Sequence, residues 1–280
     1  MTSEQTERDL VRALAALEDT RTDLLHSFDG FERLQVQLGR AGMNVDQIAE
    51  MSARGDQWQA DPDFTAMVLE QVRVDSREVG TALSDLGITR NEIAQRLDDA
   101  SEHLVRARES LSSAAARAEY GPDGEATAAA VRTVRDRVQA ASTNITAARG
   151  TLRHVDVSVA AGQAYLSSPV ASPEAARSLS TGAQLHVNDA ITAVARSLDH
   201  LDGGRDRTTH SASDVAALAE QIPTADEATR KPKAPSADEV LAKPQASTAA
   251  IAARRMAGPV RDRRDDPRPS HGPDGPARHI

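Results

Sequence analysis

The chain has 280 residues, of which six are aromatic and none is cysteine. Disulfide bridges and thiolate metal sites are therefore excluded, and a thick core filled by rings is disfavoured, since each ring buries about 150–250 Å². The formal net charge is −9, yet residues 223–280 hold eleven Lys or Arg against eight Asp or Glu, so the acidity belongs to residues 1–222.

The first predicted element is an amphipathic helix over 4–39, because apolar residues recur every three or four positions. Gly39 and Gly42 favour a C-terminal stop. A short helix then follows over 44–55, and the two helices make up an N-terminal segment, 1–59. The face expected to be buried in the longer helix is Leu10, Leu14, Leu17, Arg21, Leu24, Phe28, Phe31, Gln35 and Leu38.

A second helical region, 60–202, begins at Asp61-Pro62, an acidic N-cap followed by proline at the first helical position. Further along, Gly87 favours a helix end, and Thr89 opens a capping box that favours a new start. A column of apolar residues at seven-residue intervals runs through this point without interruption. We expect a break or kink at 87–89, with a continuous helix as the alternative.

The most regular pattern runs from Val131 to Leu166, where an apolar or small residue falls at every third or fourth position. Five heptads of this spacing indicate a coiled-coil seam. The turn signal Tyr120-Gly-Pro-Asp-Gly124 precedes it, and short turns between long helices give antiparallel neighbours. We therefore predict a helical hairpin over 90–167. Its seam residues are Leu97, Leu104, Leu111, Val138, Ile145 and Leu152.

Ser172-Pro173 starts another helix, 174–202, which the glycine pair at 203 and 204 is expected to end. Residues 203–222 are predicted to be a linker with a short helix. Nine of the thirteen prolines fall in 223–280, where few large apolar side chains could offset the entropy of ordering, so we expect a disordered Pro/Arg-rich tail. The predicted fold class is all-α: an antiparallel long-helix bundle, or coiled-coil helical hairpin, followed by this tail.

Residue types that carry catalysis are scattered. The eight histidines show no metal-ligand spacing, and no glycine-rich phosphate loop follows a strand. We expect no catalytic, metal or cofactor-binding residue. The chain is interpreted as a non-enzymatic helical scaffold or protein–protein interaction protein that acts through coiled-coil faces. The expected partner is a second copy of the chain, as a homodimer, or another helical protein.

One segment suggests a different function. Residues 86–97 resemble the turn and recognition helix of bacterial helix-turn-helix repressors, with a glycine at the turn and Ile93 and Leu97 facing inward. The resemblance implies a DNA-binding regulator that uses residues 83–97. The acidic body of the chain argues against nucleic acid as a partner. The base-contacting residues would be Arg90, Asn91, Gln95 and Arg96.

The alanine-rich hairpin also resembles the secreted helical-hairpin proteins of type VII secretion systems, which implies export. Their Trp-x-Gly motif is absent, because Gln59 and Ala60 follow Trp58. The N-terminus lacks the basic and apolar regions of a signal peptide, and no apolar run reaches the ~18 residues of a membrane span. We expect a cytoplasmic bacterial protein without membrane insertion, with signal-less export as the alternative.

Overall fold

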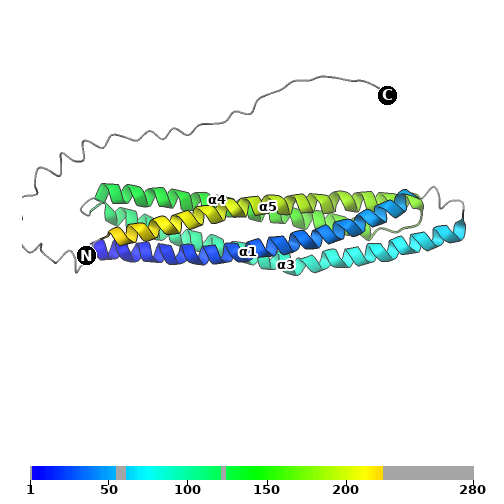
Figure 1. Ribbon diagram of the computed structural model, residues 1–280, viewed down its shortest axis with the longest axis horizontal. Coiled ribbons are helices and arrows are strands. Elements are labelled where there is room, and N and C mark those ends of the chain that lie inside the picture. The colour runs from blue at the N-terminus through cyan, green and yellow to red at the C-terminus, as the bar shows by residue number, and fades with distance from the viewer. Residues whose placement is uncertain (1, 55–60, 121–123, 223–280) are drawn as a thin grey trace, which may run out of the picture. The chain divides into compact units, whose positions relative to one another are not determined.

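A computed structural model describes residues 2–54, 61–120 and 124–222, which form four long α-helices within one compact unit (Figure 1). No strand occurs in these described ranges. The all-α fold class predicted from the sequence is therefore confirmed, and the tail predicted over 223–280 lies outside the described residues. The helices are α1 (Thr2–Ala53), α3 (Pro62–Ala118), α4 (Gly124–Leu166) and α5 (Pro173–Gln221).

The four helices form an antiparallel bundle in which each packs against two neighbours. α1 lies against α3 and α5, and α4 lies against the same two helices on the other side (Figure 1). Asp9 pairs with Arg117 and Asp23 pairs with Arg96, so α3 runs back along α1. Short connections between consecutive helices produce this up-down-up-down order.

Local capping explains where two of the helices begin. The Asp61 carboxylate accepts hydrogen bonds from the backbone N–H groups of Asp63, at 3.0 Å, and Phe64, at 3.2 Å. Ser172 Oγ accepts one from Ala175 at 3.2 Å. Each cap is followed by proline at the first helical position, where the absent N–H costs no intrahelical bond. Both predicted helix starts are confirmed.

The interior consists of narrow seams between helices. Every position of the Val131–Leu166 pattern is buried, from the valines at its start to Gly162 near its end. On α3, the seven-residue column through Val72, Val79, Leu86 and Ile93 is buried in the same way. Alternating alanines with larger side chains lets the axes approach closely, which explains how a chain with six aromatic residues fills its core.

The helix end expected at Gly39 and Gly42 is wrong, because α1 continues without interruption to Ala53. A Cβ at position 42 would stand 3.6 Å from side-chain atoms of both Val187 and Ile191 on α5. Gly42 thus lies where α1 packs on α5, and this tertiary packing outweighs the weak helix propensity of glycine.

The buried face of α1 also differs from the predicted one. Its first column, Leu10 to Leu38 at seven-residue intervals, is buried as expected. Its second column lies one residue earlier than predicted, because α1 packs between two neighbours and its inward face is centred between them. The interior therefore takes Ala13, Thr20, Ser27 and Leu34 in place of Leu14, Arg21, Phe28 and Gln35.

Two further predicted interruptions are absent. α3 is one helix through 87–89, because Leu83, Leu86 and Ile93 are buried on both sides of Gly87 and hold it in the seam. α5 likewise continues through Gly203-Gly204 to Gln221, so the predicted helix end at 202 and the linker at 203–222 are wrong. Packing on α4 keeps the glycine pair helical, because Asn144 and Ile145 lie beside it.

Candidate functional site

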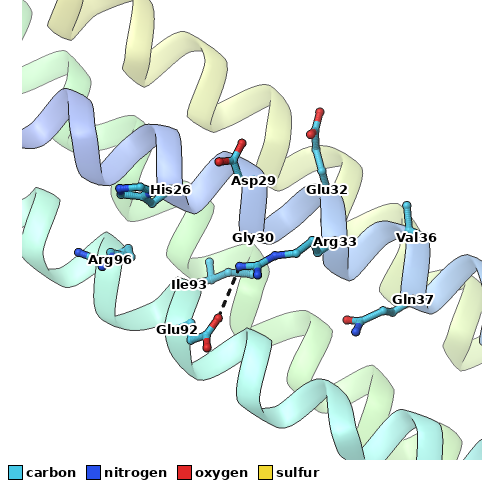
Figure 2. A pocket seen from close by; sticks show the side chains of 10 residues that line it. All are labelled: His26, Asp29, Gly30, Glu32, Arg33, Val36, Gln37, Glu92, Ile93 and Arg96. Carbon is cyan, nitrogen blue, oxygen red and sulfur yellow. Dashed lines mark ion pairs between the residues drawn. The ribbon is translucent and has the colours of Figure 1, made fainter.

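A groove of about 900 Å³ lies between α1 and α3, as Figure 2 shows. Gly30 of α1 and Ile93 of α3 line it, and a Cβ at position 30 would stand 2.7 Å from Cγ1 of Ile93. Glycine therefore allows the two helices to approach closely at this point. The other lining residues are mostly charged or polar. They are His26, Asp29, Glu32, Arg33, Val36, Gln37, Glu92 and Arg96.

Charges of both signs line this groove. Arg33 of α1 reaches across to Glu92 of α3, with 3.5 Å between Nη2 and Oε2 (Figure 2), and both side chains are exposed, so water screens the pair. Asp29 and Glu32 add two carboxylates on the α1 side. The groove therefore presents carboxylates and guanidinium groups side by side.

A buried carboxylate adjoins the groove. The Asp23 side chain is 9% exposed, and its Oδ1 accepts a hydrogen bond of 3.2 Å from Nη1 of Arg96, a groove residue. His103 Nε2 lies 3.5 Å from Oδ2 of the same carboxylate. His103 Nδ1 lies 3.9 Å from Asp19, one turn earlier on α1. The cluster ties α1 to α3, since a buried carboxylate needs partners of this kind.

A second buried carboxylate repeats the arrangement near the start of α1. Asp9 is almost fully buried and pairs with Arg117. Asp9 and Asp23 are two heptads apart, as are His103 and Arg117, so each pair of residues lies on one flank of its helix. These contacts set the register between α1 and α3, because a shift of either helix would leave buried carboxylates unpaired.

The described residues contain no group of three or more His, Asp or Glu side chains placed to hold a metal ion. Within the same residues, no helix combines the length and the apolar character that a membrane crossing requires. The contacts described at the α1–α3 site are ion pairs and hydrogen bonds between the two helices.

The six predicted seam residues all lie in the interior of the bundle, where each exposes 3% or less of its surface. Three come from α3 and three from α4, two helices that pack together. Contacts within the chain thus occupy these side chains completely. None of the six is available on the outer surface of the folded bundle. The six are Leu97, Leu104, Leu111, Val138, Ile145 and Leu152.

The helix-turn-helix geometry expected at 83–97 is wrong, because this segment lies inside the continuous helix α3. Arg90 Nη1 lies 2.5 Å from Asp156 of α4, and its side chain is mostly buried. Arg96 is engaged by Asp23, and Gln95 donates to Asp99 at 2.8 Å, whereas Asn91 is exposed. Both arginines therefore serve contacts between helices of the bundle.

Asp9 and Asp23, the two buried carboxylates of the site, were not among the residues predicted from the sequence. Their signal was present, because acids on one helix and Arg or His on another repeated at heptad intervals, as flanking positions of paired helices do. The sequence did not say which helices would be neighbours.

No family model matches the sequence, and comparisons with curated proteins and with solved structures found no match either.

Proposed function

We propose that the chain is a non-enzymatic helical scaffold that works by protein–protein contact, and that it pairs with a second copy of itself through the start of α3. The observation that carries this proposal is an exposed apolar stripe. Phe64, Met67 and Val74 are 45%, 61% and 46% exposed, although they lie within eleven residues of one helix. Exposed apolar side chains that gather on one face favour a contact surface.

The position of this stripe supports the proposal. Arg73 donates hydrogen bonds of 3.1 and 2.7 Å to the carbonyl oxygen of Val170, in the connection between α4 and α5. The stripe therefore lies at the end of the bundle, and Figure 1 shows the start of α3 reaching past the ends of the other helices. A helix end of this kind can lie beside another copy without a clash from its own neighbours.

A two-fold contact would place the stripe of one copy on the stripe of the other. In an antiparallel arrangement Phe64 of one copy lies beside Val74 of its partner, and Met67 lies near the axis. A stable dimer buries about 800 Å² on each partner. Three side chains supply only part of that area, so we expect a dimer that forms at micromolar concentration.

Sedimentation equilibrium of the full chain, at concentrations from roughly 1 to 200 μM, tests the proposal. We expect a monomer–dimer equilibrium that the double variant Phe64→Ser with Met67→Ser shifts to monomer. Val157→Ser is the matched control, because Val157 is an equally exposed aliphatic residue on the outer side of α4. A monomer at every concentration, or a dimer that the double variant leaves unchanged, would exclude this interface.

A further inference from the structure

Charged residues border the exposed apolar stripe of α3 along one flank. Asp63, Glu70 and Arg77 recur at seven-residue intervals near the start of the helix. Each lies three or four residues from Met67 or Val74, and on a helix this spacing places all of them on the same side of the stripe. The three charged side chains are exposed, so a partner that covers the stripe also meets this flank.

The three charged side chains differ in the ion pairs that they already make. Glu70 Oε2 lies 2.8 Å from Nη1 of Arg73, and the same guanidinium also donates to the Val170 carbonyl oxygen. The charge of Glu70 is therefore balanced within its own chain. Asp63 and Arg77 make no ion pair with another described residue. The flank thus carries one negative and one positive group without a partner, each seven residues from Glu70.

We propose that Asp63 of each copy pairs with Arg77 of the other, and that these two ion pairs fix the antiparallel orientation of the dimer. The proposal rests on the proposed function, because it concerns the same stripe and the same partner, a second copy of the chain. A two-fold axis beside Glu70 exchanges positions that lie equally far from it along the helix, so the ion pair forms twice. This axis also lies between Met67 and Val74, as the contact between the two stripes requires.

The charges of the flank favour the antiparallel orientation over the parallel one. In an antiparallel two-fold pair the flank of one helix faces the same flank of the other, so both free charges find an opposite charge. Only Glu70 then faces its own copy, and Arg73 already balances its charge. A parallel pair would instead face this flank with the opposite one, and Asp63 would lie against Phe64 without a cation.

Reversal of each charge in the full chain tests the pairing by sedimentation equilibrium. Asp63→Arg and Arg77→Asp each turn two attractive contacts into two repulsive ones, so each variant alone should dimerise about ten-fold more weakly than the parent chain. An equimolar mixture of the two variants should recover the parental affinity, because a copy with arginine at both positions then faces a copy with aspartate at both. The double variant Asp63→Arg with Arg77→Asp should recover it as well.

Two control variants separate the ion pairs from the net charge of the chain. Asp189→Arg and Arg153→Asp make the same charge changes at exposed positions of α5 and α4, and both should dimerise as the parent chain does. Salt gives an independent measurement: at about 1 M NaCl, where the screening length is about 3 Å, the difference between the parent chain and each α3 variant should shrink. Circular dichroism checks that every variant keeps the helix content of the parent chain.

The possible outcomes distinguish this proposal from the proposed function. A parent chain that is a monomer at every concentration overturns both. A parent dimer that depends on Phe64 and Met67, but that neither Asp63→Arg nor Arg77→Asp weakens, overturns the ion pairs alone. The ion pairs are also overturned if both variants are weakened and neither their mixture nor the double variant recovers the parental affinity.

Discussion

The ring of Tyr165 on α4 occupies the space that a side chain at position 182 of α5 would need. A Cβ on Gly182 would stand 2.3 Å from two ring carbons of Tyr165. The same ring lies against the His186 imidazole, one turn along α5, with 5.6 Å between the ring centres. Gly182 and His186 thus form a seat for the tyrosine ring, and this seat fixes the spacing of α4 and α5 near the turn that joins them.

Gly182→Ala is expected to destabilise the fold by about 1–3 kcal/mol, because the Tyr165 ring must move and lose its packing. Urea unfolding followed by circular dichroism measures this change. Gly39→Ala serves as the control: nothing lies within 4 Å of its Cβ position, so the better helix propensity of alanine should raise stability by up to ~1 kcal/mol. If both variants raise the free energy of unfolding, the packing of the Tyr165 ring does not require a glycine at position 182.

Asp23→Ala should lower the free energy of unfolding by about 1–3 kcal/mol, since it leaves Arg96 and His103 without their buried acceptor. Asp19→Ala removes a carboxylate that is largely exposed and lies 3.9 Å from the same histidine, and should change stability by less than ~0.5 kcal/mol. The double variant Asp23→Ala with Arg96→Ala should lose less stability than the sum of the losses measured for the two single variants. Additive losses would mean that the two residues act independently.

Leu104→Ala is expected to cost about 2–5 kcal/mol, because the side chain is fully buried in the α3–α4 seam. Leu104→Asp should abolish cooperative thermal unfolding, since a carboxylate there would be buried without a partner. The adjacent Val105→Ala, at a position that is 43% exposed, is the control and should have little effect. Normal melting of the aspartate variant would refute the seam assignment.

Duplex DNA is expected to show no retardation in gel mobility-shift experiments, even at low salt. Arg90 and Arg96 are engaged by Asp156 and Asp23, and α1 and α3 both carry more carboxylates than arginines. The experiment compares the parent chain with the double variant Arg90→Ala and Arg96→Ala. Salt-dependent retardation that this variant removes would instead support DNA binding through α3.

Helix starts and the regular seam could be predicted, because both depend on neighbouring residues. Asp61-Pro62 and Ser172-Pro173 begin helices through contacts with backbone groups within the next three residues. The Val131–Leu166 pattern indicates a single inward face of the helix, and all of its positions are buried. Each of these signals is complete within a single helix.

Glycines were misleading as helix ends, because their effect depends on what lies beside them. Gly42 and Gly204 were expected to stop helices, yet each lies against side chains of a neighbouring helix. In the α1–α3 site, the heptad intervals of Asp23 and His103 were visible in the sequence, but their pairing depended on which helices became neighbours. Helix propensity acts over about one turn. The continuation of the helices through these glycines and the pairing of Asp23 with His103 depend instead on contacts between residues far apart in the chain.

The sequence by itself determined that this protein is helical, where two of its helices begin and which face of α4 is buried. Tertiary structure alone decided that α1 runs unbroken, that its interior takes Ala13, Thr20 and Ser27, and that Asp23 meets Arg96 and His103. The physical reason is that apolar periodicity gives a helix an inward face, but the neighbours on both sides set the centre of that face. The same neighbours decide which polar groups are taken out of water and which remain free for a partner.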